Sequence, residues 1–437
     1  MSTSKEFREQ RSFRNGAMLD EAPQGYFSHS ASAEELSGRR ILIYAMNFSP
    51  EVTGCGRYTG ELAIALADNG AQVSVVTTPP HYPGWQVRYG YSARRYSSER
   101  RQDILIERCP IYLAKTMKGI ARAVAPITWA LSSAPIIIYR VARFRPTHLY
   151  CVEPTLFAAP IAILAARLVG AKTILHVQDL EIEAAFAVGH VKNAFIKRVA
   201  TLFDSVVLKG FDQVVTISHK MREKLIAKGV KPAAAHVIRN WVNVSKIYPL
   251  LRPSIFRDEL EIGETDFVVL YAGNIGAKQA LHLLIDAATK LVGSKRIVFV
   301  IAGEGPDKKK LVDRNLPNVI FLPLQPETRL NELLNLADVH VIPQDKGVAD
   351  LVLPSKLGGI VASGKPMIAM ADQGTEIFDF LKNHAVLIPP GDADGLAASI
   401  DAVATQTSPS RPSSGQKAIL EELSETLNIS KFVEAFK

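Results

Sequence analysis

Short apolar runs alternate with longer amphipathic stretches along most of the chain. The runs are bounded by turn-forming residues, as expected for strands buried on both faces of a parallel sheet. The stretches between them, such as 58–70 and 220–229, have a helical period and end on a glycine. The apolar runs lie at 39–48, 71–78, 148–154, 173–179 and 213–219, and again at 267–274, 296–303, 319–324, 339–344, 366–371 and 385–390. This alternation predicts an α/β protein whose parallel sheets are covered by helices.

One irregular stretch divides the alternation into two halves. Residues 240–266 are polar, lack a period and contain two prolines, which is typical of an interdomain linker. The predicted boundaries are a disordered leader at 1–38, a first Rossmann-like domain at 39–240, a linker at 241–265, and a second Rossmann-like domain at 266–437 whose last helix is free to cross back to the first domain. The expected fold is therefore α/β, with two Rossmann-like parallel-sheet domains facing a cleft.

Residues 119–145 depart from this pattern. From Ala123 to Tyr139 there are 17 residues without a charge, near the lower limit for a membrane span, although Pro126 and Pro135 interrupt them. Three arginines follow: Arg140, Arg143 and Arg145. Three interpretations stay open, namely a buried helix of the first domain, an interfacial helix with snorkelling arginines, and a membrane span.

The composition is that of a globular protein. Of 437 residues, 47% are hydrophobic and 22% are charged, which excludes a disordered or fibrous chain. The three cysteines are too widely spaced for a zinc motif or a disulfide framework. Residues 1–38 lack an apolar run long enough for a signal sequence, so we expect a cytoplasmic protein.

Positive charge is concentrated in the first predicted domain. Residues 39–232 hold 26 Lys and Arg against 13 Asp and Glu, whereas residues 233–437 hold 21 against 24. This imbalance indicates that one domain faces an anionic surface, either nucleic acid or a membrane leaflet. Because the chain has no recognised nucleic-acid module and no interleaved aromatic and basic residues, we expect a peripheral association with the inner face of the plasma membrane and no nucleic-acid partner.

Two glycine-bearing turns follow predicted strands. Gly54 and Gly56 lie in the first, and Gly273 and Gly276 in the second, where Asn274 and Lys278 are close by. Glycines between a strand and a helix let backbone amides approach a phosphate, although the same pattern occurs in tight turns without a ligand. The spacing differs from the dinucleotide fingerprint, which argues against an NAD oxidoreductase.

Three further groups of side chains follow strands or begin helices. Pro354, Ser355 and Lys356 stand at a predicted helix start, where a hydroxyl, amides and an ammonium can hold an anion. His176 and Asp179 lie at the carboxyl end of a strand, where α/β folds place functional groups. His81, Tyr82 and Trp85 form an aromatic loop able to stack on a sugar.

Seven motifs in order resemble glycosyltransferase family 4, and most closely its colanic-acid-type exopolysaccharide members. The motifs are NFSPEVTGCGRYTGELA, TILHVQDLE, NWVN, YAGNIGAKQAL, IAGEGP, LPLQP and VLPSKLGGIVASGKP. The resemblance covers residues 39–437. It implies a GT-B fold, a retaining reaction, a nucleotide-sugar donor bound in the cleft, a saccharide acceptor carried on a polyprenyl diphosphate, and no metal or other cofactor.

The resemblance also groups the candidate residues by role. Donor candidates are Gly54, Gly56, Gly273, Asn274, Gly276, Gly303, Asp350, Pro354, Ser355 and Lys356. Catalytic candidates are His176, Asp179, Lys278 and Lys356, and acceptor candidates are His81, Tyr82 and Trp85. Without a metal, lysines and backbone amides would meet the charge of the leaving diphosphate.

Two details qualify the comparison with the family. The string Asp392-Ala393-Asp394 is the one candidate for a metal-binding Asp-x-Asp, but it precedes a helical stretch, and Asp394 is expected to cap that helix. Family members carry two glutamates eight positions apart near the Pro-Ser-Lys string, and these positions are Leu351 and Gly359 here. Asp350, next to the first of them, is the nearest acidic substitute.

Two other function classes stay open. A nucleotide-sugar epimerase of the same fold would share the donor site, and epimer formation from the donor alone would distinguish it. A non-catalytic membrane-binding protein would share the basic first domain and lack turnover.

Overall fold

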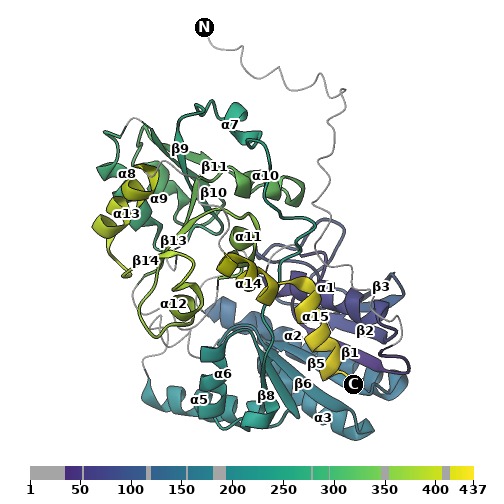
Figure 1. The fold of residues 1–437 in the computed structure, drawn as a ribbon. Coiled ribbons are helices and arrows are strands. Elements are labelled where there is room, and N and C mark those ends of the chain that lie inside the picture. The colour runs from purple at the N-terminus through teal and green to yellow at the C-terminus, as the bar shows by residue number, and fades with distance from the viewer. Residues whose placement is uncertain are drawn as a thin grey trace, which may run out of the picture.

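The computed structural model consists of two α/β domains, each built around a parallel sheet (Figure 1). It describes residues 35–51, 54–114, 120–153, 156–180, 193–276, 279–294, 296–345, 354–405 and 414–437. The predicted fold class is confirmed, because both sheets are parallel at every named pair except one edge hairpin.

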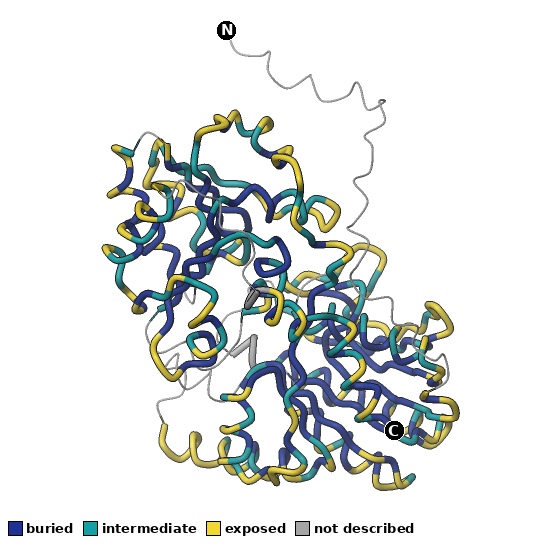
Figure 2. The backbone as a smooth tube through the Cα atoms, viewed as in Figure 1, coloured by how far each residue is buried: buried dark blue, intermediate teal, exposed yellow. Residues whose placement is uncertain are grey.

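The first domain has an eight-stranded sheet of order β3-β4-β2-β1-β5-β6-β7-β8. Its strands are β1 (Arg40–Ala45), β2 (Gln72–Thr77), β3 (Ser97–Arg101), β4 (Ile104–Arg108), β5 (His148–Glu153), β6 (Lys172–Val177), β7 (Gln213–Thr216) and β8 (Ala235–Val237). The central strands are mostly apolar and are buried along nearly their whole length, as in β5, because helices cover both of their faces (Figure 2).

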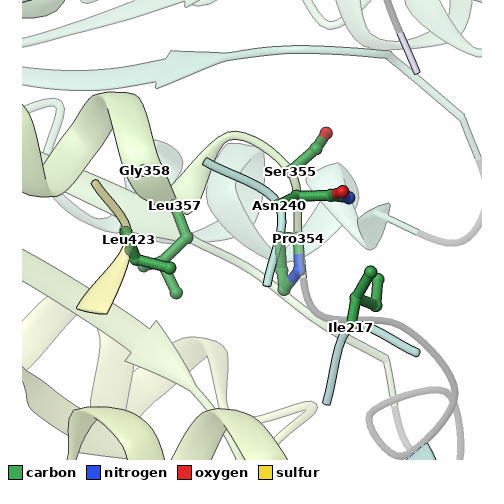
Figure 3. A pocket seen from close by; sticks show the side chains of 7 residues that line it. All are labelled: Ile217, Asn240, Pro354, Ser355, Leu357, Gly358 and Leu423. Carbon is green, nitrogen blue, oxygen red and sulfur yellow. The ribbon is translucent and has the colours of Figure 1, made fainter. Parts of the chain in front are cut away.

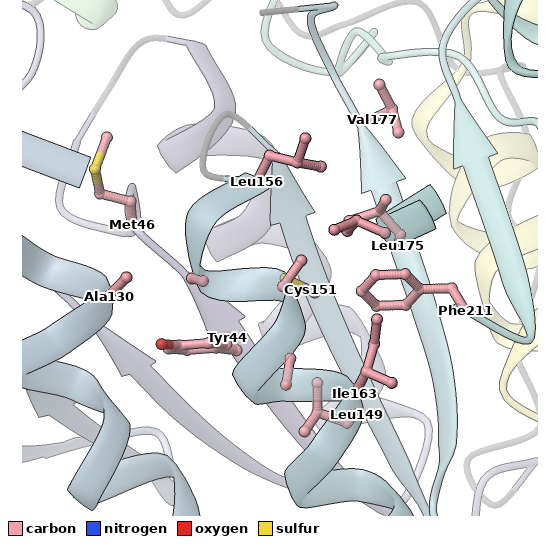
Figure 4. Close-up of a cluster of buried hydrophobic side chains, with 14 of the residues drawn as sticks. Tyr44, Met46, Ala130, Leu149, Cys151, Leu156, Ile163, Leu175, Val177 and Phe211 are labelled. Atoms are coloured by element: carbon pink, nitrogen blue, oxygen red, sulfur yellow. The ribbon is translucent and has the colours of Figure 1, made fainter. Parts of the chain in front are cut away.

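Alternate residues of each central strand enter different cores. Leu42 and Tyr44 of β1 pack beneath α2 (Ile120–Phe144), α3 (Ala159–Val169) and α5 (Ala194–Leu208), in the cluster of Figure 4. Ile41 and Ile43 pack on the opposite face, beneath α1 (Gly54–Asp68) and the last helix of the chain, α15 (Glu425–Ala435). The remaining helical elements are η1 (Leu156–Ala158), α6 (His219–Ala227) and η2 (Pro232–Ala234).

The apolar segment at 119–145 contains the whole of α2, and both prolines lie inside the helix. Trp129 and Ile137 are fully buried against the sheet, whereas Leu131 is 68% exposed on the outer side. Among the described residues, Val124–Phe144 is long and apolar enough to cross a membrane by length and composition alone. Its packed inner side agrees with the interpretation of a helix belonging to the first domain.

The second domain has a six-stranded sheet of order β11-β10-β9-β12-β13-β14. Its strands are β9 (Phe267–Ala272), β10 (Ile297–Ala302), β11 (Val319–Leu322), β12 (Val339–Ile342), β13 (Met367–Met370) and β14 (Val386–Ile388). Its helical elements end with α14, which precedes α15 in the chain. They are α7 (Phe256–Glu259), α8 (Leu281–Lys290), α9 (Lys308–Val312), η4 (Glu327–Arg329), α10 (Leu330–Asn335), α11 (Leu357–Ala362), α12 (Glu376–Leu381), α13 (Ala393–Thr405) and α14 (Ser414–Glu422).

Two chain segments cross between the domains side by side. Trp241 lies in the core of the first domain and the next residue, Val242, in a core of the second. Val242 also forms a bridge with Ser424, on the segment that returns from α14 to α15. In α15, Phe432 is fully buried in the first domain, so the end of the chain packs on the domain in which the chain began (Figure 1).

A buried ion cluster holds this crossing together. The guanidinium of Arg239, in the last segment of the first domain, donates to Glu376 of α12 at 2.8 Å and to Glu422 of α14 at 2.6 Å. Glu376 also accepts the backbone N–H of Lys220 at 3.0 Å, at the start of α6 in the first domain. Arg239 is 4% exposed and Glu376 is 6% exposed. The cluster therefore joins the two domains through a buried pair, Arg239 and Glu376, with Glu422 at its partly exposed side.

Replacing Arg239 should be costly for this reason. Arg239→Ala leaves the Glu376 carboxylate buried without its cation, which we expect to lower the free energy of unfolding by about 3–5 kcal/mol. Arg314→Ala is the matched control, because the Arg314–Asp286 pair is exposed and the loss should stay below about 1 kcal/mol. Urea denaturation of both variants measures the difference, and equal stabilities would contradict the assignment of Arg239 as the interdomain contact.

Candidate active site

Residues of both domains line a pocket between the two sheets (Figure 3). Ile217 directly follows β7, and Asn240 belongs to the segment after β8, so both lie beyond the carboxyl ends of strands. The second domain contributes the residues that begin α11. The full lining is Ile217, Asn240, Pro354, Ser355, Leu357, Gly358 and Leu423. A crevice outside the carboxyl ends of parallel strands is where open α/β sheets bind ligands.

Glycines stack tightly at the carboxyl edge of the second sheet. Gly273 follows β9 and Gly303 follows β10, and a Cβ on Gly303 would lie 1.9 Å from the carbonyl oxygen of Gly273. Gly305 is equally constrained, because its Cβ would lie 2.1 Å from the carbonyl oxygen of Ile275. The φ angles of these three glycines, 150–158°, are ones that other residues rarely adopt. The two turns therefore form one closely packed backbone surface.

Lys356 joins this surface from the start of α11. Its Nζ lies 3.9 Å from the centre of the Tyr271 ring, and its Cδ would be 3.7 Å from a Cβ on Gly273. The Tyr271 hydroxyl donates to the carbonyl oxygen of Asn274 at 2.6 Å, which fixes the ring beside the turn. Burial lowers the pKa of Lys356 to about 7. An ammonium that is poorly hydrated gains stability when an anion binds next to it.

Polar side chains of the first domain reach the same cleft. Gln178 follows β6 and exchanges two hydrogen bonds with Asn240, of 3.1 Å and 2.8 Å. The next residue, Asp179, is partly buried after the same strand. Asn240 lines the pocket that Ser355 lines from the second domain, so the Gln178–Asn240 pair lies at the interdomain pocket.

The first glycine turn differs from the expectation. Gly56 lies within α1, and a Cβ on it would lie 2.5 Å from the carboxylate of Glu51, which is itself buried. Gly56 therefore allows close packing of α1 on Glu51, and a carboxylate at this position makes the turn a poor place for a phosphate. Gly54, with a φ of 62°, lies at the start of the helix beside the Tyr82 ring.

The loop with His81, Tyr82 and Trp85 is held by the same carboxylate. Glu51 accepts the backbone N–H groups of His81 at 2.9 Å and Tyr82 at 3.0 Å. His81 is 3% exposed and serves the packing of the loop, whereas Tyr82 is 41% exposed and forms an edge contact with Trp85. Tyr82 is therefore the side chain of this loop that is open to a ligand.

His176 lies in the core and not in the cleft, which corrects its assignment as a catalytic residue. It is 2% exposed, its Nδ1 shares a 2.5 Å hydrogen bond with the Tyr150 hydroxyl, and its ring contacts Phe432 of α15. Burial lowers its pKa to about 3, so the ring is neutral near pH 7. Its physical role is to pack the sheet against the last helix.

The remaining predictions divide into three groups. Asn274 and Gly276 lie on the turn after β9, and Pro354 and Ser355 line the pocket. Lys278, Asp350 and Leu351 lie outside the described residues. Asp392, and not Asp394, caps α13 by accepting the Gly395 N–H at 2.7 Å, while Asp394 pairs with Lys290. No group of three His, Cys, Asp or Glu residues able to hold a metal occurs in the described part of the chain.

Family comparisons match both domains. Residues 53–241 match the glycosyl transferase 4-like domain, and residues 266–406 match the glycosyl transferases group 1. The putative colanic acid biosynthesis glycosyl transferase WcaI of Escherichia coli K12 is 37% identical over 374 residues, covering 83% of this chain and 91% of that protein. The probable glycosyltransferase WbjE of Pseudomonas aeruginosa is 24% identical over 270 residues, covering 60% and 67%.

Solved structures share the fold. Sucrose-phosphate synthase of Thermosynechococcus elongatus superposes with a TM-score of 0.71 at 15% identity, covering 91% of this chain and 98% of that one. Anabaena HepE, solved in complex with UDP-glucose, gives a TM-score of 0.63 at 14% identity over 91% and 98%. At these identities the likeness establishes the GT-B arrangement of two domains.

The stacked turns yield a prediction about backbone strain. Gly303→Ala adds a Cβ that collides with the Gly273 carbonyl and forces an unfavourable φ, so we expect a loss of at least about 1–3 kcal/mol in stability. Gly293→Ala is the control, because a Cβ there meets nothing within 4 Å. Thermal melting compares them, and a Gly303→Ala protein that melts with the control would show that the turns are not packed as described.

Proposed function

This chain belongs to the glycosyltransferases that combine a glycosyl transferase 4-like domain with a group 1 domain, and we propose that it is a retaining, metal-independent enzyme that moves a sugar from a nucleotide-sugar donor to a lipid-linked saccharide. The process would be the biosynthesis of an exopolysaccharide or capsule. One observation carries the proposal: the Lys356 ammonium and the stacked turns at Gly273 and Gly303 lie at the edge of the second sheet, across the cleft from Gln178 and Asn240.

The donor would bind on the second domain. A nucleotide-sugar diphosphate is anionic, and its charge increases on the leaving oxygen as the glycosidic bond breaks. Lys356 is placed to offset this charge because it lies against Tyr271 with a lowered pKa, beside backbone that no Cβ covers. Ser355, the residue before Lys356, offers a hydroxyl in the pocket that Asn240 lines from the first domain. This assignment uses groups of the protein alone and needs no bound metal.

The acceptor would approach from the first domain. Tyr82 presents an exposed ring beside Gly54, at the edge where β1 and β2 end, and such rings stack on sugars. Glu51 holds the loop through two backbone N–H groups, so the ring position is set before the acceptor binds. We propose a polyprenyl diphosphate as the carrier of the acceptor saccharide, and the inner face of the plasma membrane as the place of reaction.

The proposed reaction retains the anomeric configuration. The bond between the anomeric carbon and the diphosphate oxygen breaks, and the acceptor hydroxyl forms its new bond on the same face of the sugar. The acceptor proton passes to the departing phosphate oxygen, so no separate base is required. Asp179, after β6, is the candidate for orienting the acceptor hydroxyl. His176 supports the sheet from the core and takes no part in proton transfer.

Removal of the Lys356 charge should slow transfer. We expect Lys356→Ala to lower kcat about a hundredfold to a thousandfold, or about 2.7–4 kcal/mol, because the charge acts mainly in the transition state. Lys365→Ala is the matched control, since Lys365 is also partly buried but precedes β13, at the opposite edge of the same sheet. Transfer of radiolabelled sugar from a panel of nucleotide sugars to membrane lipid extract provides the measurement.

Two controls sharpen this test. A lysine is charged below its pKa, so kcat/KM should fall as the pH rises above about 7, and this dependence should vanish in Lys356→Ala. Chelator should leave the rate unchanged. Turnover of Lys356→Ala within a few-fold of wild type would exclude the proposed role, and strict dependence on a divalent ion would exclude the metal-independent reaction.

The stereochemistry of the product is a separate prediction. The product of an α-linked donor should be an α-glycoside, because bond breaking and bond formation occur on one face. The coupling constant of the anomeric proton in the NMR spectrum reports this directly. A β-glycoside from an α-linked donor would contradict the retaining reaction while leaving the donor site intact.

A further inference from the structure

Three helices cover one face of the first sheet as a single layer. The first, α2, connects β4 to β5, while α3 connects β5 to β6 and α5 connects β6 to β7. The three helices therefore lie over neighbouring strands and share one hydrophobic core. Phe157, just before α3, stacks on Phe203 of α5 with ring centres 6.1 Å apart. We call the outward surface of these three helices, with η1, the outer layer.

The outward side of α5 is apolar at helical spacing. Phe195, Val199, Leu202 and Val206 are 74%, 50%, 64% and 59% exposed, and their spacing of four, three and four residues places them in one stripe. The inner side of the helix is already filled, since Val207 and Leu208 are buried in the core. The helix therefore has a second apolar side that nothing in the described structure covers.

The other two helices repeat this feature. Leu164 and Leu168 of α3 are 60% and 70% exposed, and Leu131 and Ile138 of α2 are 68% and 47% exposed. Of the 23 large hydrophobic side chains exposed in the described residues, twelve lie on the outer layer. They are Ile127, Leu131, Ile138, Tyr139, Phe157, Leu164, Leu168, Phe195, Ile196, Val199, Leu202 and Val206. Concentration of this kind marks an interaction surface and not the scatter found on most soluble domains.

The charges of the outer layer have one sign. Asp204 is the one acidic residue within α2, α3 and α5, and it is buried and paired with Lys228. Arg167, Arg198 and Lys209 are exposed on or next to α3 and α5. Arg140 is bound to Glu107 and so adds little, whereas Arg143 in the last turn of α2 is exposed and adds to the basic charge. The surface thus combines apolar stripes with a basic border.

We propose that the outer layer docks the protein onto an anionic phospholipid bilayer, with the α5 stripe inserted among the acyl chains and Arg198 and Lys209 at the headgroups. Apolar burial and attraction of basic residues to anionic lipid are the two terms of interfacial binding. The inference rests on the proposed lipid-linked acceptor. α3 and α5 begin beyond the carboxyl ends of β5 and β6, at the cleft side of the domain, so the docked layer leads from the bilayer to the active site.

Flotation with phosphatidylglycerol vesicles tests this surface without any sugar transfer. At low salt we expect wild type to float with these vesicles and to remain in solution with phosphatidylcholine vesicles. Leu202→Gln with Val206→Gln should reduce the partition coefficient at least about tenfold, because two exposed apolar side chains are lost from the stripe. The control is Leu251→Gln with Leu324→Gln. Both leucines lie in the second domain and are exposed, so this variant should float as wild type does.

The outcomes separate docking from catalysis. Both double variants should hydrolyse the donor and transfer to a soluble acceptor analogue at the wild-type rate, since none of the four residues contacts the cleft. Failure of all transfer with normal flotation would overturn the proposed function alone. Wild-type flotation of Leu202→Gln/Val206→Gln would overturn the docking surface. A wild-type dimer in light scattering that these substitutions dissociate would identify a second copy of the chain as the occupant and also overturn it.

Discussion

The ion cluster at Arg239 is the contact on which the arrangement of the two domains depends. A guanidinium buried to this degree must be paired, and its partners Glu376 and Glu422 come from the second domain and from the segment that returns to the first. Beside it, Trp241 and Val242 anchor the linker in two different cores. The next residue after Arg239 is Asn240, so this contact lies directly beside the first-domain wall of the pocket.

The fold could be predicted from the sequence because strands buried on both faces must be mostly apolar. β1, β5 and β9 are such strands, and their runs stand out without any knowledge of their neighbours. The hairpin of β3 and β4 was missed because an edge needs no apolar run, and the residues of β3 are Ser-Ser-Glu-Arg-Arg. The hairpin joins the sheet because β4 pairs with β2, and a pairing between strands that lie apart in the chain leaves no local pattern.

The candidate site was predictable where a local pattern carries the chemistry, as at Gly273, Gly303 and the start of α11. It was not predictable where the deciding partner lies far along the chain. His176 has the residue type and strand position of a catalytic group, but Phe432 of the last helix covers it. Tyr271 and Gln178 gave no signal in the sequence, because their roles arise from contact with Lys356 and Asn240.

The central claim is that a nucleotide sugar binds against the stacked turns and Lys356 at the edge of the second sheet. Backbone amide hydrogen exchange, followed by mass spectrometry with and without each donor of a panel, tests it at the level of peptides. We expect the matching donor to slow exchange at 272–276, 303–308 and 354–360, while the first-domain turn at 54–60 changes little. Protection confined to 54–60, or none with any donor, would contradict it.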